Sequence, residues 1–337
     1  MTIGFDELGL AARNHGFPLE MLREPVTPAG LHYLLIHFDI PAVDAATWHL
    51  EVGDASFTLD ELKARERRTL AVTLECAGNG RALLGGERAA SQPWLIEAVG
   101  NAEWTGTPLA PLLRETGLAD GAAEIAFTGL DRGYQGGVEH AYGRSLALEE
   151  ALRDDVLLAY EMNGAPLLPQ HGYPLRLVVP GWYGMTHVKW LQRIDALTEP
   201  YSGWQQTDAY FIEDVPVTRM RPRALLVPPG IPDFLTRERY ADAGRHELTG
   251  RAWSGLGAIE RVEVSDDGGA TWADAQLDEP AGPYAWRGWR IEWDAKPGEH
   301  ELCCRATDSA GNSQPDKAEW NHGGYCNNAI QRVRVKV

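Results

Sequence analysis

The chain's 337 residues exceed what one hydrophobic core usually supports, so we expect two folded domains. Its apolar fraction of 44%, which includes 12 Trp and 11 Tyr, provides material for packed cores and excludes an intrinsically disordered protein. The formal net charge of -17 disfavours binding to nucleic acid, and any small anionic substrate would require a local basic pocket.

The beginning of the chain and its cysteines indicate the compartment. The first residues show neither a secretory signal nor a twin-arginine signal. Charged residues or prolines interrupt every apolar run before the roughly 20 residues that a membrane-spanning helix needs. The four cysteines do not form the pattern of a disulfide framework, and we expect Cys303, Cys304 and Cys326 to pack as free thiols. We therefore expect a cytoplasmic protein with no membrane and no nucleic-acid partner.

The first two-thirds of the chain mix helical and strand patterns. Strands are predicted at 69–74 and 176–179, where each apolar run ends in a turn that contains glycine or proline. A proline-rich stretch over 215–233 predicts a linker or an extended connection, because proline cannot occupy the interior of a regular ladder. The sequence therefore predicts an α+β domain over 1–218 and a second domain over 219–337.

The second domain shows the alternation of apolar and polar residues that is typical of half-buried strands. Turn-forming clusters at 266–269, 296–298 and 308–312 punctuate this region. We predict an all-β sandwich of the immunoglobulin type. The alternating apolar positions are Ile259, Val262 and Val264, then Trp289, Ile291 and Trp293, and finally Val333, Val335 and Val337.

Residues 73–81, TLECAGNGR, place a cysteine where a predicted strand ends. A turn at this point would expose the Cys76 sulfur, and the neighbouring glycines would let a ligand approach closely. The charge of Arg81 would favour the thiolate, which is the form that binds a soft metal. Taken alone, a cysteine beside an arginine is more often a packed residue. The motif therefore leaves packing and metal binding as alternatives.

Residues 171–190, HGYPLRLVVPGWYGMTHVKW, combine glycines, prolines and cationic side chains. Glycine turns offer backbone N–H groups to a phosphate, and Arg176 and Lys189 offer positive charge. A buried strand pair with solvated ends is the alternative for either residue taken singly. Together these groups indicate a cofactor with a phosphate tail.

Four segments resemble signatures of the sulfite oxidase family of molybdenum enzymes and occur in the family's order. They are CAGNGR at 76–81, HGYPLR at 171–176, GMTHVKW at 184–190 and WNHGGYCNN at 320–328. The resemblance extends over nearly the whole chain. It implies a molybdopterin-binding α+β domain followed by an immunoglobulin-like domain that forms a homodimer contact.

The same resemblance implies roles for individual residues. Cys76 would be the protein's single ligand to molybdenum, whose other ligands include the dithiolene sulfurs of molybdopterin. Arg81 would bind the substrate anion, Trp94 would wall its pocket, and Tyr210 is the candidate for a catalytic tyrosine. The residues that would contact the cofactor are His37, Cys76, Asp131, His171, Arg176, His187 and Lys189.

The chain departs from the family's pattern at three positions of the expected pocket. Leu35 and Gly323 stand where sulfite oxidases carry arginines. Because a charge-assisted hydrogen bond contributes roughly 1.5–3 kcal/mol, losing both would weaken binding of a dianion by several kcal/mol unless other cations replace them. Tyr210 comes one residue later after Asp208 than the family's tyrosine does after its aspartate, and a local bulge could restore its direction. A packing tyrosine is the alternative.

The resemblance implies oxygen-atom transfer, with oxidation of sulfite to sulfate as the expected reaction. The sequence has no CxxCH haem-attachment motif and no metal-cluster cysteine pattern, so an external acceptor such as a cytochrome would take the electrons, as in a haem-free bacterial-type member. A reductase of nitrate or an S-oxide on the same fold is the nearest alternative. Two others are a hydrolase with Cys76 as nucleophile and His37 or His171 as base, and a non-enzymatic binding protein.

Overall fold

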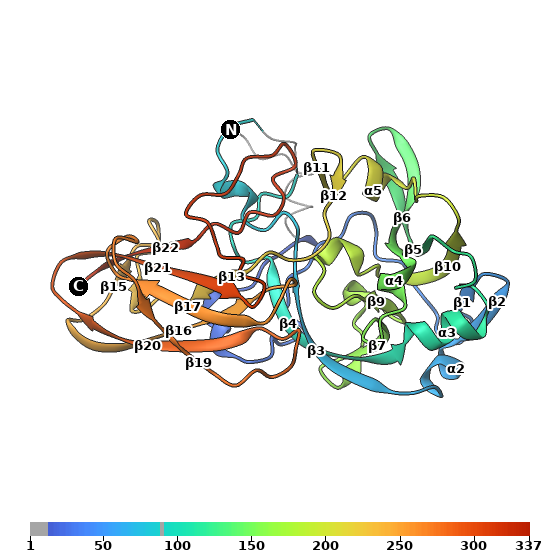
Figure 1. Ribbon diagram of the computed structural model, residues 1–337, viewed down its shortest axis with the longest axis horizontal. Coiled ribbons are helices and arrows are strands. Elements are labelled where there is room, and N and C mark those ends of the chain that lie inside the picture. Colours follow the sequence, from blue (N-terminus) through green and yellow to red (C-terminus); the bar gives the residue numbers. More distant parts are fainter. Residues whose placement is uncertain (1–12, 88–90) are drawn as a thin grey trace.

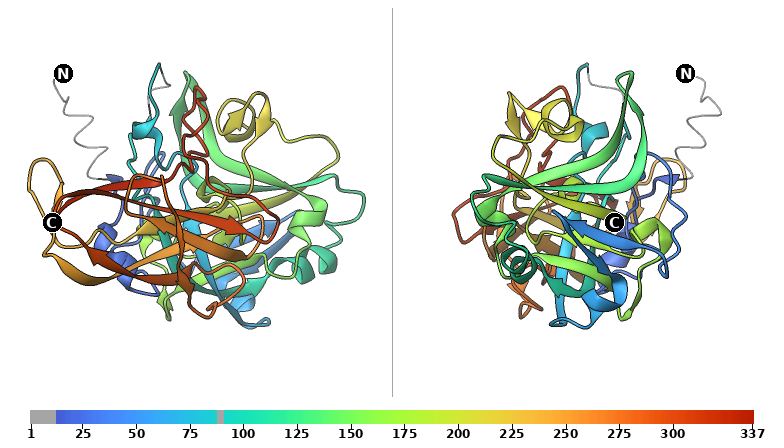
Figure 2. Two further views of the ribbon diagram at one scale, coloured as in Figure 1. Left: turned by 60° about the vertical axis from the view of Figure 1, so that its left-hand side comes forward. Right: turned by 90° about the vertical axis from the view of Figure 1, so that its right-hand side faces the viewer.

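The computed structural model describes residues 13–87 and 91–337, which form two lobes lying side by side (Figure 1). In Figure 1 the first lobe lies on the right, and the second lobe extends to the C-terminus on the left. Strands β3 (Arg68–Glu75) and β4 (Val99–Pro108) of the first lobe run along the junction. Figure 2 shows that the long hairpin of β5 (Glu124–Gln135) and β6 (Val138–Ala147) and the loops after β21 (Glu299–Asp308) rise on the same side of the molecule.

The described part of the first lobe contains two β-sheets, short helices and a small hairpin, so strands predominate over helices in this α+β domain. The predicted strands at 69–74 and 176–179 correspond to β3 and to β9 (Arg176–Val178). No helix in the described part of the chain has the length and apolar character needed to cross a lipid bilayer.

The first sheet of this lobe consists, in spatial order, of β2 (Ala55–Thr58), β1 (His49–Val52), β10 (Leu191–Leu197), β5 (Glu124–Gln135) and β6 (Val138–Ala147). The second consists of β3 (Arg68–Glu75), β4 (Val99–Pro108), β7 (Leu157–Met162) and β8 (Ala165–Pro166), with β9 (Arg176–Val178) paired to β7. The helices are α2 (Leu59–Lys63), α3 (Leu109–Glu115), α4 (Leu148–Ala151) and α5 (Trp204–Thr207), and β11 (Phe211–Ile212) pairs with β12 (Val215–Pro216).

Strand β3 is covered on both faces at its C-terminal end, just before Cys76. Its residues from Val72 to Glu75 are all buried, although successive side chains of a strand point to opposite faces. Val72 and Leu74 pack in a core of the first lobe. The Thr73 N–H donates a 2.9 Å hydrogen bond to the carbonyl of Tyr284, a residue of the second lobe. The residues that follow β3 are therefore fixed between the two lobes.

The second lobe is a β-sandwich, as predicted, in which the two sheets share one apolar core. Leu248 and Trp289 reach that core from one sheet, and Val262 and Leu302 reach it from the other. The first sheet consists of β13 (Arg223–Leu226), β16 (Gly244–Trp253), β20 (Arg287–Ala295) and β19 (Gln276–Leu277). The second consists of β14 (Ile231–Pro232), β15 (Arg239–Tyr240), β22 (Gln331–Lys336), β21 (Glu299–Asp308), β17 (Ile259–Ser265) and β18 (Ala273–Asp274).

A register shift explains the irregular apolar spacing in β17. Ile259 and Val262 are three residues apart, which does not fit a period of two, yet both are buried. The pairing of β17 with β21 shifts between Ile259 and Arg261. An extra residue in one strand restores both side chains to the core side.

The predicted linker over 215–233 is partly wrong, because it contains the fully buried strand β13. This strand pairs with β16 from Arg223 to Leu226. Pro222 immediately precedes it, and Pro228 follows soon after its end, so the prolines flank the ladder instead of interrupting it. The short strand lies between prolines that concealed it in the sequence.

Candidate active site

Cys76 is the first residue after β3 and begins a tight turn. The Asn79 N–H donates to the Cys76 carbonyl at 2.9 Å, and the Arg81 N–H donates to the Gly78 carbonyl at 3.0 Å. Gly80 has φ +90°, a left-handed conformation that favours glycine. A Cβ atom on Gly78 would lie 2.4 Å from the Arg81 guanidinium. The turn therefore favours glycine at position 80, whereas a side chain at position 78 would have to displace the Arg81 guanidinium.

The Cys76 side chain faces the interior, so the expectation of an exposed sulfur is wrong. The residue is only 4% exposed, packs with Trp94, and has Tyr33 and Leu35 against it. Burial raises the pKa of the Cys76 thiol, and the charge of Arg81 offsets this effect only in part. The expectation that Arg81 holds the thiolate form is therefore also wrong for the protein alone. A bound metal cation would itself favour the thiolate.

A narrow internal cavity of about 60 Å³ opens beside Cys76. All seven residues that the resemblance implies as cofactor contacts line it, although they come from segments far apart in the sequence. Tyr210 lines the same cavity. The fold therefore brings these residues together: His37, Cys76, Asp131, His171, Arg176, His187 and Lys189.

Arg176 is a buried cation at one wall of the cavity. Its Nη1 and Nη2 atoms donate to the carbonyls of His171 and His187 at 3.1 and 3.2 Å, and its guanidinium lies 4.6 Å from the Trp104 ring centroid. Burial lowers the pKa of Arg176 to about 10, so the side chain stays charged at neutral pH. Its buried Nε has no hydrogen-bond partner among the described residues. The Nε–H of Arg176 can therefore donate a hydrogen bond to a bound group.

Lys189 and Asp131 form a second charged part of the lining. The Lys189 Nζ donates to the Leu35 carbonyl at 2.9 Å and to the Gln170 carbonyl at 3.3 Å. Burial lowers the pKa of Lys189, and burial raises the pKa of Asp131 although the lysine's charge opposes that rise. The buried Oδ1 atom of Asp131 has no hydrogen-bond partner in the described part of the chain. An additional donor placed there would stabilise the carboxylate.

His187 lines the cavity, but its ring nitrogens are both engaged with the backbone. Nδ1 accepts a 3.1 Å hydrogen bond from the Val179 N–H, and Nε2 lies 3.1 Å from the Trp182 carbonyl, to which it donates. The ring therefore anchors the loop between β9 and Lys189 and has no nitrogen left for a cofactor. His171 is similarly tied through Nε2, which lies 2.9 Å from the Ala29 carbonyl.

Acid is expected to destabilise the protein through His187. Burial lowers the pKa of His187 from 6.5 to about 3, so below pH 6.5 the unfolded chain takes up a proton that the folded protein does not. The contribution of this histidine to stability is complete above pH 6.5. It decreases by up to about 1.4 kcal/mol per pH unit as the pH falls toward 3.

Urea denaturation at several pH values between 7 and 5 measures this loss. The variant His187→Gln has no titrating ring, so its free energy of unfolding should depend less on pH, even if it is less stable at pH 7. Identical slopes in the two proteins would show that another group causes the acid sensitivity.

Arg81 and Trp94 lie beside the cysteine turn but are not among the described residues that line the cavity. The Arg81 Nε donates to the Gly323 carbonyl at 2.8 Å, and the guanidinium lies 5.2 Å from the ring centroid of Tyr325. Trp94 lines a larger neighbouring groove of about 1320 Å³. At position 323 the closing segment therefore contributes a backbone acceptor for Arg81, and its glycine supplies no second cation.

Tyr210 reaches the cavity through an unusual backbone conformation. It has φ +59°, which is rare for a residue other than glycine. Its hydroxyl oxygen lies 2.6 Å from Nε2 of His37. The extra residue after Asp208 is thus accommodated by a left-handed residue just before β11 and not by a bulge in a strand ladder.

Three aromatic or histidine side chains of the cavity were not predicted: His32, Tyr33 and Tyr142. Burial lowers the pKa of His32 to about 3, and its buried Nε2 has no partner among the described residues. Tyr33, Leu34, Leu35 and His37 belong to one short irregular segment that lines the cavity. The segment has no regular period in the sequence, so only the resemblance at His37 pointed to it.

Two family models match the chain. The oxidoreductase molybdopterin binding domain matches residues 37–205, and the Mo-co oxidoreductase dimerisation domain matches residues 225–337. Mitochondrial sulfite oxidase of Mus musculus is 36% identical over 95% of this chain and 63% of its own length. The chain thus spans less than two-thirds of that relative.

Two further similar proteins are named for activities other than sulfite oxidation. Nitrate reductase of Hordeum vulgare is 32% identical over 96% of this chain and 40% of its own length. The crystal structure of the sulfane dehydrogenase SoxCD from Paracoccus pantotrophus has a TM-score of 0.82 and 29% identity, and covers 95% of this chain and 84% of that one.

The cavity provides groups that fit a molybdopterin cofactor. Cys76 offers a soft sulfur ligand for the metal. Asp131 Oδ1, Arg176 Nε and His32 Nε2 are buried polar atoms that lack partners within the described residues, and each such atom costs about 1–3 kcal/mol until a polar group pairs with it. Because the two family models and the identity to sulfite oxidase agree with these groups, the chain belongs to the sulfite oxidase family of molybdopterin-dependent oxidoreductases and uses the molybdenum cofactor.

Proposed function

We propose that the chain oxidises sulfite to sulfate and passes the electrons to an external acceptor such as a cytochrome. The main support is that Cys76 and six other cofactor-signature residues meet at one buried cavity. When bound, the molybdenum cofactor supplies the two-electron redox chemistry. Water provides the added oxygen atom, and two protons and two electrons leave for each sulfate formed.

The cavity residues divide into groups that hold the metal and groups that hold the organic part of the cofactor. Cys76 supplies the protein's sulfur ligand. Arg176 supplies positive charge for an anionic phosphate, in a buried site where charge interactions are strong. Burial lowers the pKa of Lys189 to about 7, and a bound phosphate would favour its charged form. Asp131 would accept a hydrogen bond from a donor group of the cofactor through its buried Oδ1. His187 contributes by fixing the loop that carries Lys189.

The substrate side of the site is proposed to involve Arg81, Trp94 and Tyr210. Arg81 brings a positive charge close to the cysteine turn and attracts an anion there. Trp94 packs on Cys76 and limits the space beside it. Burial raises the pKa of Tyr210 well above its usual range, so its hydroxyl keeps its proton and acts as a hydrogen-bond donor.

Tyr210→Phe is expected to lower kcat/KM for sulfite by roughly 10- to 100-fold, the range found when a group that supports a metal site is removed. The variant loses only the hydroxyl that contacts His37. Tyr142→Phe is the matched control, because Tyr142 also lines the cavity but donates its hydroxyl to the Met185 carbonyl at 2.6 Å. Equal kinetic effects of the two substitutions would remove the special role of Tyr210.

Steady-state assays on molybdenum-containing protein test the proposed function. Sulfite oxidation with an electron acceptor is compared with reduction of nitrate or a sulfoxide with an electron donor. Rapid sulfite turnover that scales with molybdenum content supports the proposal. Reduction of nitrate or a sulfoxide without sulfite turnover would overturn it, and turnover by metal-free protein with covalent trapping of Cys76 would point to a hydrolase.

One observation favours a reductase of nitrate or an S-oxide as the second candidate. Leu35 lines the cavity where an arginine was expected, so this wall is apolar. A less charged or bulkier substrate would suit such a wall better than a dianion does. The similarity to a nitrate reductase is compatible with this alternative.

We also propose that residues 219–337 form an immunoglobulin-like dimerisation domain attached to a cofactor domain over 1–218, and that the homodimer is cytoplasmic. The sandwich and the match to a dimerisation model over 225–337 support the dimer. The mass of the full chain in solution, measured by sedimentation, tests it.

A further inference from the structure

Glu75, the residue immediately before Cys76, is a buried carboxylate paired with a cation from the other lobe. Its Oε1 lies 2.7 Å from Nη1 of Arg223, the first residue of β13. Glu75 is 2% exposed and Arg223 is 1% exposed. An ion pair this far from water depends strongly on its geometry, because neither charge can be solvated if the partner moves.

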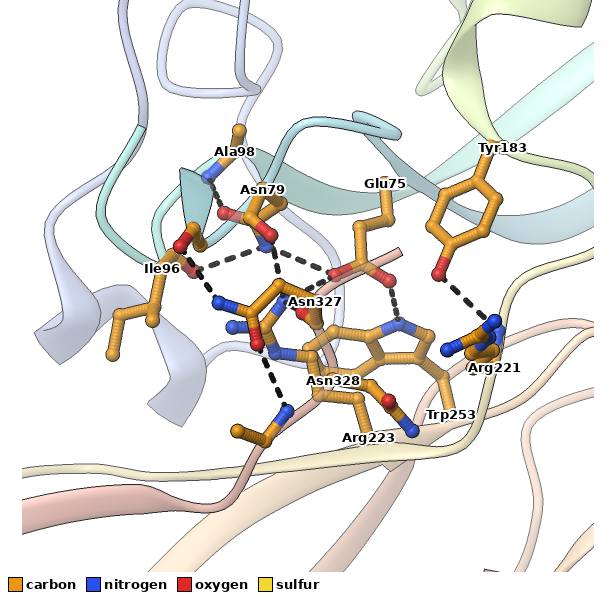
Figure 3. Close-up of polar contacts among 12 residues, drawn as sticks. Glu75, Asn79, Ile96, Ala98, Tyr183, Arg221, Arg223, Trp253, Asn327 and Asn328 are labelled. Atoms are coloured by element: carbon orange, nitrogen blue, oxygen red, sulfur yellow. Dashed lines mark hydrogen bonds and ion pairs between the residues drawn. The ribbon is translucent and has the colours of Figure 1, made fainter. Parts of the chain in front are cut away.

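Trp253 holds the second oxygen of the same carboxylate. Its Nε1 donates to Oε2 of Glu75 at 2.9 Å. Trp253 is the direct partner of Arg223 in the pairing of β13 with β16, so the two side chains start from neighbouring backbone positions. Figure 3 shows both side chains converging on Glu75 from the second lobe. Arg223 and Trp253, which form one cross-strand pair, therefore each bind one oxygen of the Glu75 carboxylate.

The same contacts continue into the cysteine turn. The Asn79 Nδ2 donates to Oε1 of Glu75 at 3.0 Å, and the Asn79 Oδ1 accepts from the Ala98 N–H at 3.1 Å (Figure 3). Asn79 also donates its backbone N–H to the Cys76 carbonyl at 2.9 Å. The position of the Glu75 carboxylate therefore determines where Asn79 lies, and Asn79 closes the turn around Cys76.

The closing segment of the second lobe holds the other side of the turn. The Cys326 N–H donates to the Ala77 carbonyl at 2.8 Å, and the Asn327 Nδ2 donates to the Gly80 carbonyl at 2.7 Å. The Asn327 carbonyl in turn accepts a 2.9 Å bond from Arg223. Arg223 thus contacts both the carboxylate before the turn and the segment that supports its far end.

We propose that Glu75, Arg223 and Trp253 form a positioning clamp through which the second lobe sets the orientation of the Cys76 sulfur. An apolar cluster of the same size could stabilise the interface equally well. The charged clamp adds direction, since each bond fixes a particular oxygen relative to the turn. The proposal rests on the assignment of Cys76 as the metal ligand in the proposed function.

Trp253→Phe in the full-length, molybdenum-loaded protein tests the clamp. It removes one donor to Glu75 and keeps an aromatic ring in the core. Trp293→Phe is the matched control, because the Trp293 Nε1 makes a similar 3.0 Å bond to a carboxylate oxygen of Asp266, in the same lobe but away from the turn. The readouts are hydrogen–deuterium exchange of a peptide covering 76–81 and the thiolate-to-molybdenum absorption band, measured beside molybdenum content.

The clamp predicts at least about tenfold faster exchange in the 76–81 peptide of Trp253→Phe, from loss of one hydrogen bond to a charged group, together with a shifted absorption band. Trp293→Phe should change neither. Equal exchange and equal spectra in the two variants would overturn the proposal, even if both proteins are less stable than the parent.

A second pair of variants keeps the test decisive if Trp253→Phe does not fold. Glu75→Gln removes the charge and keeps the size, and Asp266→Asn does the same at the control site. Only the Glu75 variant should disturb the 76–81 peptide and the absorption band, and equal effects would again reject the clamp. Failure of the proposed function is separate, since it would appear as absent sulfite turnover in the parent protein, and failure of the ligand assignment would appear as an unchanged molybdenum signal in Cys76→Ser.

Discussion

Cys76→Ser is expected to lower sulfite turnover by more than about 100-fold and to remove the thiolate-to-molybdenum absorption band. Substitution of residues that only support a metal ligand already costs 10- to 100-fold in affinity or activity, so loss of the ligand itself should cost more. Serine is nearly isosteric, but its oxygen is a hard donor that replaces a soft one. Because Cys76 lies in a cavity lined by polar groups, the smaller polar atom should not by itself disrupt packing.

Cys303→Ser provides the control with the same chemical change. Cys303 lies on β21 in the second lobe, and its sulfur is 3.8 Å from the Glu301 carbonyl, which a serine hydroxyl can also use. Turnover and molybdenum content should stay near those of the parent protein. A Cys76→Ser protein with full turnover and a normal molybdenum signal would refute the ligand assignment.

Arg223→Ala is expected to reduce the free energy of unfolding by about 3–5 kcal/mol, the usual cost of leaving one partner of a buried ion pair without the other. Trp253 and Asn79 would still donate to Glu75, but both are neutral groups. The carboxylate charge would therefore stay buried without a counterion. Urea denaturation monitored by tryptophan fluorescence measures the loss.

Arg245→Ala is the matched control, because Arg245 forms an exposed ion pair with Glu292 at 3.7 Å within the same lobe. Such surface pairs contribute less than about 1 kcal/mol. The double variant Glu75→Gln/Arg223→Met should be more stable than Arg223→Met alone, since it leaves no unpaired charge. If Arg223→Ala and Arg245→Ala had the same small effect, the buried pair would have no special energetic role.

The sequence was sufficient where local chemistry determines structure. The run before Cys76 predicted the strand that is now β3, and the glycines at 78 and 80 marked a turn that includes a left-handed residue at position 80. The cationic residues of the 171–190 motif also meet in the predicted cavity. In each case the signal lies within a few neighbouring residues.

The sequence was insufficient where the folded backbone decides which groups meet, or where an element is too short to show a pattern. Nothing near His187 shows that the Val179 N–H and the Trp182 carbonyl use up its ring nitrogens. The buried state of Cys76 depends on packing by Trp94, and the sulfur was therefore wrongly expected to be exposed. Strand β13 was missed because four residues between prolines carry too little pattern.

The long-range bonds around the cysteine turn also set an order of assembly during translation. Glu75 and Arg223 are 148 positions apart, and Gly80 and Asn327 are 247 apart, so the turn stays incomplete until the segment around Asn327 has been synthesised. Closing loops of this length is slow compared with forming local strands. We therefore expect the turn around Cys76 to reach its final geometry only after both lobes have been synthesised and docked.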